Sequence, residues 1–362
     1  MLRATVDDAQ QSRRTPMSVV RRIHSAASFQ SRQHSRQRDG ATTLLIVVAA
    51  VAAISVGAQA VVDRSPHRSA RIESAGARIH FLEWGTDGPA VVLLPGYSLT
   101  AHVFEDVAAA LPKQFHVVAI TPRGFGESDA PADGAYTITT LVDDLRTLLD
   151  SLHITSAALV GHSLSGTVIA AFALLYPERV TRLVFLDSYP YFLQEHGDSI
   201  ENLDPVVMPL FVGDTTYAAL ARFLRRYRFV PWQPALDADL RAKPLGAEAI
   251  RRQTLTRSYI TDQWDHTPDV SRLTVPSLQL CAVPSVASEY PWLTAADMGY
   301  RAAQRYVGRH LLPFSRRLCR RFKATVPGAT IATLHGSHYL FFTRPSVTAR
   351  ALTAFLDADL HE

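Results

Sequence analysis

One serine stands between an apolar run and a helical stretch, where a nucleophile can be held in an exposed turn. The run Ala157–Val160 predicts a short strand, and Ser163 follows it in the sequence Gly-His-Ser-Leu-Ser-Gly, directly before the helical stretch Leu164–Tyr176. A serine on a sharp strand-to-helix turn presents its hydroxyl above the sheet, and small residues on either side let the strand and the helix approach each other. Ser163 is therefore predicted to be the nucleophile of an acyl-transfer reaction.

A base for this serine is expected near the end of the chain. His338 leaves a predicted strand, Thr330–Leu334, on a Gly-Ser turn, and a closing helix is predicted at Pro345–Leu356. A serine hydroxyl is a weak nucleophile until a neighbouring base takes its proton, and an imidazole can do this. His338 is predicted to be that base, whereas His335, three residues earlier, is expected to pack at the strand end.

The same reaction needs donors for the negative charge that develops on the substrate oxygen. Backbone N–H groups that are in place before the reaction meet this need. In a strand-turn-helix nucleophile, one donor is the N–H of the residue after the serine, here Leu164. The other comes from the loop after an earlier strand, here the N–H of Tyr97 after the apolar run Ala90–Leu94. These two N–H groups are predicted to form an oxyanion hole.

The elements that must position these residues alternate along the chain. Apolar runs that predict strands alternate with stretches whose apolar spacing predicts helices. The predicted strands are Ile79–Trp84, Ala90–Leu94, His116–Ile120, Ala157–Val160, Val180–Leu186, Val275–Ala282 and Thr330–Leu334, and the predicted helices are Phe104–Leu111, Thr139–Leu152, Leu164–Tyr176 and Pro345–Leu356. This alternation predicts an α/β fold with a mostly parallel sheet and helices on both faces.

The alternation stops over residues 188–273, a stretch that is rich in aromatic side chains. An insertion of this length after a strand is predicted to form a helical cap. Such a cap would lie over the carboxyl ends of the strands, where ligands bind in open α/β sheets.

Four segments, in this order, resemble the α/β-hydrolase superfamily, in its capped serine-hydrolase (esterase/lipase-like) branch. They are residues 93–97, 121–128, 157–166 and 334–345. Three positions depart from the family pattern: Pro95 replaces a usual His, Thr121 a usual Asp and Ser165 a usual Gly. The resemblance runs from about Arg71 to the C-terminus, and it implies the α/β-hydrolase fold with a helical cap inserted after the sixth strand.

The sequence leaves open which residue is the acid that would orient His338. In this family the acid follows the serine and precedes the histidine. Its usual place, just past the strand Val275–Ala282, holds no carboxylate in register. The family also uses the end of the preceding strand, where Asp187 follows Leu186, although many members keep a structural Asp there. Asp187 is the first candidate, Glu289 and Asp297 are the alternatives, and the absence of any triad acid is the last possibility.

The predicted activity is that of a serine hydrolase, an enzyme that cleaves a carboxylic ester, or else a thioester or an amide, through an acyl-enzyme. Relatives with Asp at the elbow form alkyl-enzymes from halides or epoxides, and Ser163 argues against those reactions. A carbon–carbon bond hydrolase, a cofactor-free peroxidase and a non-catalytic binding protein of this fold are the alternatives. The sequence has no metal-ligand spacing and no phosphate-binding loop, so neither a metal nor a cofactor is predicted. The expected partner is a small-molecule ester or acyl substrate.

The N-terminal region differs from the rest of the chain. The net charge is +4 over 362 residues, but residues 1–40 contain eight Arg and three Asp, a balance of +5. The remaining chain therefore has a balance of −1 and gives no indication of nucleic-acid binding. Residues 41–62 carry no charge and are long enough to cross a membrane.

These features predict four parts. They are a disordered basic tail (1–40), a transmembrane signal anchor (41–62), a linker (63–70) and a hydrolase domain (71–362). The expected location is a single-pass membrane protein with an extracytoplasmic catalytic domain. Cleavage near Ala60, after a small-x-small pattern, is the alternative and would secrete the domain. The sequence leaves open whether Cys281 and Cys319 pair, and also the oligomeric state.

Overall fold

The structure is a computed structural model that describes residues 66–190, 216–229 and 231–357. The predicted tail, the predicted anchor 41–62, the cleavage position at Ala60 and the first part of the linker lie outside the described residues. None of the helices in the described ranges has the length and hydropathy that a membrane crossing requires.

Eight strands form one sheet within the described part of the chain. They are β1 (Arg68–Ser74), β2 (Ala77–Trp84), β3 (Ala90–Leu94), β4 (His116–Ile120), β5 (Ala157–His162), β6 (Val180–Leu186), β7 (Ser277–Val283) and β8 (Thr330–His335). Their order in the sheet is β1-β2-β4-β3-β5-β6-β7-β8. The pairs β1–β2 and β2–β4 are antiparallel, and all other pairs are parallel. The mostly parallel sheet is confirmed, whereas β1 was not predicted.

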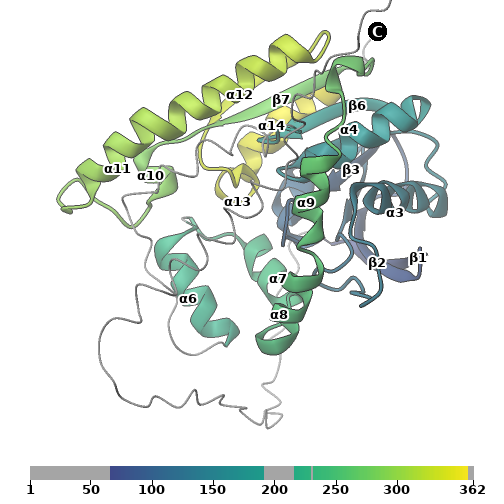
Figure 1. The fold of residues 1–362 in the computed structure, drawn as a ribbon, viewed down its shortest axis with the longest axis horizontal. Coiled ribbons are helices and arrows are strands. Elements are labelled where there is room, and N and C mark those ends of the chain that lie inside the picture. The colour runs from purple at the N-terminus through teal and green to yellow at the C-terminus, as the bar shows by residue number, and fades with distance from the viewer. Residues whose placement is uncertain (1–65, 191–215, 230, 358–362) are drawn as a thin grey trace, which may run out of the picture. The chain divides into compact units, whose positions relative to one another are not determined.

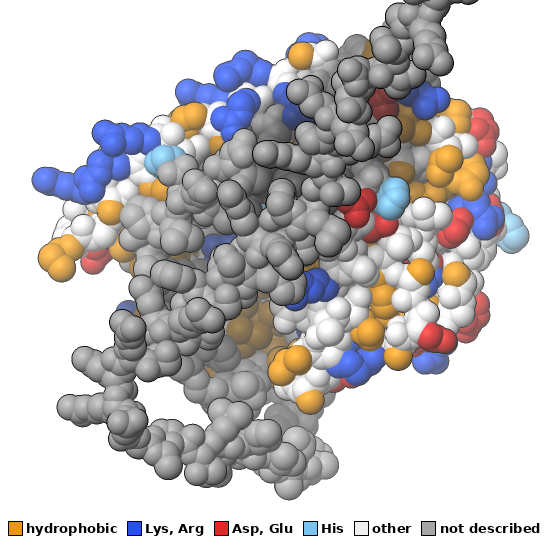
Figure 2. Space-filling view, in the orientation of Figure 1, with side chains coloured by type: hydrophobic (Ala, Val, Ile, Leu, Met, Phe, Trp, Pro, Cys, Tyr) orange, Lys and Arg blue, Asp and Glu red, His pale blue; other side chains and the backbone are white. Residues whose placement is uncertain are grey.

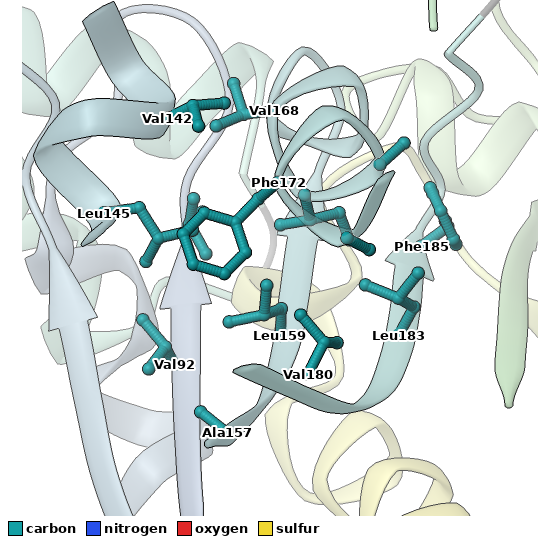
Figure 3. Packing of buried hydrophobic residues seen from close by; sticks show 14 of the residues in the cluster. Val92, Val142, Leu145, Ala157, Leu159, Val168, Phe172, Val180, Leu183 and Phe185 are labelled. Atoms are coloured by element: carbon teal, nitrogen blue, oxygen red, sulfur yellow. The ribbon is translucent and has the colours of Figure 1, made fainter. Parts of the chain in front are cut away.

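Helices cover both faces of this sheet (Figure 1). Alternate residues of a buried strand point to opposite faces, so Val92 and Leu94 belong to one core cluster while Val91 and Leu93 belong to the other. The first cluster lies under α3 (Ile138–Ser151), α4 (Ser165–Leu175) and α12 (Leu312–Thr325), and the second under η1 (Ala101–Phe104), α2 (Glu105–Ala110), α13 (Leu340–Thr343) and α14 (Pro345–Leu356). In the first cluster the ring of Phe172 lies between the side chains of the helix α3 and those of the strands (Figure 3).

The chain leaves the sheet between β6 and β7, and the helices described there confirm the predicted insertion after the sixth strand. They are α6 (Tyr217–Tyr227), α7 (Pro234–Ala242), α8 (Gly246–Leu255) and α9 (Ser258–Asp265). Polar contacts fasten them to the sheet domain. The buried Asp239 accepts hydrogen bonds from the N–H and the hydroxyl of Thr100, both at 2.8 Å, and the Tyr259 hydroxyl donates to the Arg123 carbonyl at 3.0 Å. We call α6–α9 the first excursion.

A second excursion, which was not predicted, lies between β7 and β8. It contains α10 (Val286–Glu289), α11 (Tyr300–Tyr306), the π-helical segment η4 (Val307–Leu311) and α12. The disulfide Cys281–Cys319 joins β7 to α12, which answers the question of cysteine pairing. Leu318 and Phe322 of α12 are buried in the first core cluster.

The outer surface of the second excursion is basic. Residues 300–325 include eight Lys or Arg residues, all exposed, and no Asp or Glu. Figure 2 shows these side chains gathered along α11 and α12. The second excursion therefore joins a disulfide-bound inner face to a positively charged outer face.

Candidate active site

Ser163 occupies a sharp turn between β5 and α4. Its backbone φ is +53°, in the left-handed region that residues other than glycine rarely adopt. The turn needs glycine nearby, because a Cβ on Gly161 would lie 2.8 Å from the Ser165 carbonyl oxygen and one on Gly166 would lie 1.8 Å from Ser188 Oγ. Ser165 is tolerated in place of the usual glycine because its hydroxyl donates a hydrogen bond to the Pro95 carbonyl.

The loop after β3 lies directly against this turn. A Cβ on Gly96 would come within 2.8 Å of both Ser163 Cβ and His162 Nδ1, so only glycine permits this approach. Tyr97 and Leu164 line the same pocket as Ser163. Both residues therefore lie at the pocket that holds the serine, and an oxyanion hole formed by their backbone N–H groups stays a prediction.

An acid and an imidazole meet at the ends of β6 and β8. His338 Nδ1 lies 2.7 Å from Asp187 Oδ2. The other carboxylate oxygen, Oδ1, accepts a hydrogen bond from the Ala282 N–H at 2.8 Å and from the Tyr189 hydroxyl at 3.4 Å. Asp187 also has a positive φ, +43°, so the backbone leaves the extended conformation directly after β6. Because Nδ1 contacts Asp187, His338 Nε2 is the nitrogen that can accept the proton of Ser163.

Ser163 and His338 line one pocket, but within the described residues no hydrogen bond joins their side chains. A looser contact before substrate binds is common, because such bonds tighten in the reacting complex. The arrangement can therefore support proton transfer from the serine hydroxyl once a substrate fills the pocket.

The two alternative acids lie elsewhere. Asp297 accepts hydrogen bonds from the N–H and hydroxyl of Thr294, at 2.6 and 2.8 Å, and serves as a turn cap. Glu289 lines the pocket, where its Oε1 accepts a hydrogen bond of 3.3 Å from the Ser288 hydroxyl. Burial raises the pKa of Glu289 to about 7, against the opposing charges of Arg228 and His338. The structure brings Asp187, and neither alternative, into hydrogen-bond contact with the imidazole.

His162 is a second imidazole at this site that the sequence did not single out. It is fully buried, its ring centroid lies 4.4 Å from that of His338, and its Nε2 is 3.0 Å from the His338 carbonyl oxygen. Burial holds the pKa of His162 well below its usual value, so the ring is neutral and Nε2–H can donate to that carbonyl. His162 therefore holds the backbone of the loop that carries His338. A histidine between a glycine and a serine gives no such signal in sequence.

The pocket has a volume of about 520 Å³. Its floor is formed by Ser163, Asp187 and His338, and its walls come from both excursions. The wall residues are Arg228 and Ile260 from the first excursion and Glu289, Leu311, Phe314, Ser315 and Leu318 from the second.

Arg228 is half-buried and has no ion pair in the described part of the chain. Its guanidinium carbon lies 5.7 Å from the ring centre of Tyr339. The pocket is thus mainly apolar, with one cation and one carboxyl in its walls.

Comparison with known proteins finds several hydrolases. A family described as alpha/beta hydrolase fold matches residues 89–266. The 2-(acetamidomethylene)succinate hydrolase of Mesorhizobium japonicum is 29% identical over 301 residues, which cover 80% of this chain and 95% of that protein. Epoxide hydrolase 4 of Mus musculus is 32% identical over 123 residues; this match covers 33% of this chain and only 34% of the relative, about a third of its length. A crystal structure of a probable hydrolytic enzyme from Pseudomonas aeruginosa superposes with a TM-score of 0.56 at 22% identity, covering 81% of this chain and 95% of that one.

Proposed function

Because this chain belongs to the α/β-hydrolase superfamily, we propose that it is a serine hydrolase that cleaves a carboxylic ester through an acyl-enzyme on Ser163. One observation carries this proposal. Ser163 lies at a strained turn in the same pocket as His338, whose Nδ1 is 2.7 Å from the Asp187 carboxylate. A serine, a histidine and an acid in this arrangement are the parts of a nucleophilic triad.

The proposed reaction has two steps. His338 Nε2 takes the proton of Ser163 Oγ as that oxygen bonds to the ester carbonyl carbon, and the imidazolium then protonates the leaving alcohol as the ester C–O bond breaks. Water, deprotonated by the same imidazole, releases the acid and restores the serine. Asp187 stabilises the imidazolium in both steps, and the N–H groups of Tyr97 and Leu164 stabilise the oxyanion.

Ester cleavage is favoured over epoxide opening, although epoxide hydrolases are among the relatives. An acyl-enzyme on Ser163 has a carbonyl that water can attack. An epoxide opened by a serine oxygen would leave an ether, which has no carbonyl and would not be released. The serine at position 163 therefore supports acyl transfer.

A second candidate is the hydrolysis of an amide or ester whose acyl or leaving group carries a carboxylate. Two observations favour it. Arg228 is a cation in the pocket wall without an ion pair in the described residues, and one relative that matches 80% of this chain is named for a succinate derivative. A guanidinium can bind a carboxylate through two parallel hydrogen bonds.

A fluorophosphonate probe, followed by p-nitrophenyl esters of rising acyl length, tests the proposed function. The wild type should be labelled at Ser163 and should turn over at least one ester. Ser163→Ala should lose labelling and about 10³-fold or more of the turnover, because removal of one triad member disables the unit. Ser271→Ala, a change of an exposed serine outside the pocket, is the matched control and should behave like the wild type.

A wild type without labelling or turnover would instead support a non-catalytic member of the fold. Turnover that survives in Ser163→Ala would overturn the assignment of the nucleophile.

We also propose that residues 41–62 anchor the protein in a membrane with the catalytic domain outside the cytoplasm. The buried Cys281–Cys319 disulfide supports an oxidising location. Carbonate-resistant membrane association with an intact N-terminus should be observed. Full-length protein in the soluble fraction would contradict insertion, and a mature N-terminus near Val61 would indicate a cleaved signal.

A further inference from the structure

Two imidazoles and a carboxylate converge outside the pocket, at the antiparallel edge of the sheet. His80 lies on β2, His102 on η1 and Glu127 in the loop after β4. Glu127 Oε2 is 3.1 Å from His80 Nε2 and 3.3 Å from His102 Nε2. Neither these residues nor their neighbours line the pocket around Ser163. The cluster is therefore a separate feature with no part in the proposed hydrolysis.

The spacing of these three atoms suits one tetrahedral metal ion. Zinc bonds to imidazole nitrogen and carboxylate oxygen at about 2.0–2.1 Å, so neighbouring ligand atoms of a tetrahedral site lie about 3.3–3.4 Å apart. The observed separations of 3.1 and 3.3 Å are close to this value. All three ligand atoms lie within 4.8 Å of one another, so one ion can reach them with small side-chain shifts.

The second nitrogen of each imidazole already has an oxygen partner. His80 Nδ1 is 2.9 Å from the Thr121 hydroxyl, which is itself held by the Ala101 N–H at 2.9 Å. His102 Nδ1 contacts the carboxylate of Glu105. Histidines that bind metal are usually oriented in this way, with the other ring nitrogen hydrogen-bonded to a carboxylate, carbonyl or water. Both rings are thus fixed with Nε2 facing Glu127.

From this geometry we infer a binding site for zinc, or a similar divalent transition metal, with His80 Nε2, His102 Nε2 and Glu127 Oε2 as ligands. A donor set of two nitrogens and one oxygen suits zinc rather than calcium or magnesium, which prefer oxygen alone. The Ser69 hydroxyl, 3.1 Å from His80 Nε2, marks the position where a fourth ligand, either this hydroxyl or a water, would complete the site. The ion would link β1, β2, η1 and the loop after β4, and its role would be structural.

An ion network without metal is the competing explanation. A protonated His102 between Glu105 and Glu127 would satisfy the same contacts, and Arg71 also approaches Glu127 Oε1, at 3.6 Å. The two explanations differ in one respect. A metal site gains stability when zinc is added, whereas an ion network does not.

The test uses the full-length chain, purified in detergent and treated with EDTA, with calorimetric titration of Zn²⁺ and thermal unfolding as readouts. We expect one zinc per chain and a Tm rise of about 5 °C at a zinc concentration about 100-fold above Kd. Glu127→Gln and His102→Gln should lose this stoichiometric binding and the Tm rise. His266→Gln is the matched control, because His266 also contacts a carboxylate, Asp262 at 2.9 Å, but belongs to no three-ligand cluster of the described residues.

Further readouts make the result decisive. Co²⁺ should give the visible absorption of a tetrahedral complex in the wild type and in His266→Gln, and Ca²⁺ and Mg²⁺ should leave the Tm unchanged. Labelling of Ser163 by the fluorophosphonate should not depend on zinc, which separates this inference from the proposed function. If zinc fails to raise the Tm of the wild type, or raises that of Glu127→Gln equally, the cluster is an ion network only and the inference is wrong.

Discussion

The floor and the walls of the pocket are built by different means. Ser163 and Asp187 directly follow β5 and β6, and His338 lies just past β8, so the parallel sheet itself sets their spacing. The walls come from two excursions that leave the sheet after β6 and β7. A change in the floor should therefore reduce turnover of every substrate. A change in a wall should instead alter which substrates bind, or how stable the wall is.

The two walls also differ from each other. The first excursion is fastened by buried polar contacts such as that of Asp239 with Thr100. The second is fastened by a covalent bond, Cys281–Cys319, and by the Ser315 hydroxyl, which donates to the Ala282 carbonyl at 2.7 Å. Each wall also supplies one charged side chain to the pocket. The predictions that follow test these contrasts.

The largest effect is expected in the floor, at the acid. Asp187→Asn should lower ester turnover by about 10²-fold to 10⁴-fold, because an amide favours the wrong tautomer of His338 and cannot stabilise the imidazolium. Glu289→Gln, a matched carboxyl-to-amide change in a wall, should cost less than about tenfold, because Glu289 makes no hydrogen bond to the imidazole. Steady-state kinetics with one p-nitrophenyl ester compares the two. If Glu289→Gln loses most of its ester turnover while Asp187→Asn keeps nearly all of it, Asp187 is only a structural cap.

The next effect concerns the covalent fastening of the second wall. Replacing both Cys281 and Cys319 by Ala should lower the free energy of unfolding by about 3–4 kcal/mol, because the disulfide closes a loop with a sequence separation of 38 residues. No described hydrogen bond joins either cysteine to Ser163 or His338, so the folded variant should still be labelled at Ser163. Without the disulfide, the pocket-lining residues Leu311 and Phe314 would be held less firmly. We therefore expect the variant to accept esters over a broader range of acyl lengths. Denaturant unfolding and the ester panel measure the two effects, and wild-type protein under reducing conditions is the control. Unchanged stability would mean that the disulfide does not form.

The floor could be predicted from the sequence better than the walls. Ser163 lies in a strand-turn-helix pattern, which marks it locally, and Asp187 directly follows the apolar run Leu183–Leu186, which made it the first of several candidate acids. The second excursion has no such signal. In α12 the buried positions Leu318, Cys319 and Phe322 alternate with pairs of arginines, and a run this rich in charge does not indicate packing against a core. Its role depends on the disulfide to β7, a contact between distant segments.

The cluster at the sheet edge could not be predicted from the sequence either, because it too depends on contacts between distant segments. His80, His102 and Glu127 are 22 and 25 positions apart and come from a strand, a short helix and a loop. Metal-binding motifs are recognised by short spacings within one element. Only the packing of η1 and the loop after β4 against β2 brings these residues together.

A further test compares the two charged wall residues, beginning with Glu289. Its pKa is raised from 4.5 to about 7 in the folded chain, mainly by burial. A carboxyl with a raised pKa contributes stability that is fully present below pH 4.5 and is lost as the pH rises through about 7. The wild type should therefore lose up to about 3 kcal/mol of stability across this interval. Arg228, His338 and Asp187 are the charged groups that act on this carboxyl.

Unfolding by denaturant at several pH values measures this change. Glu289→Gln should flatten the loss between pH 4.5 and 7, because an amide does not ionise, whereas Asp297→Asn, a change of an exposed turn cap, should leave the slope unchanged. Equal slopes in the wild type and Glu289→Gln would mean that this carboxyl is open to water.

The smallest effect is expected at the cation of the first wall. If Arg228 binds a substrate carboxylate, Arg228→Met should raise KM about tenfold for an ester that carries a carboxylate and leave kcat nearly unchanged. Tenfold corresponds to about 1.4 kcal/mol, which is reasonable for a half-buried guanidinium that water still reaches. Arg226→Met is the matched control, because Arg226 lies on the same helix end with an exposed side chain outside the pocket lining. A neutral ester of the same length should show equal KM values in all three proteins. If KM rises equally for both esters in Arg228→Met, the residue only packs against Tyr339, and the pocket has no preference for an anionic substrate.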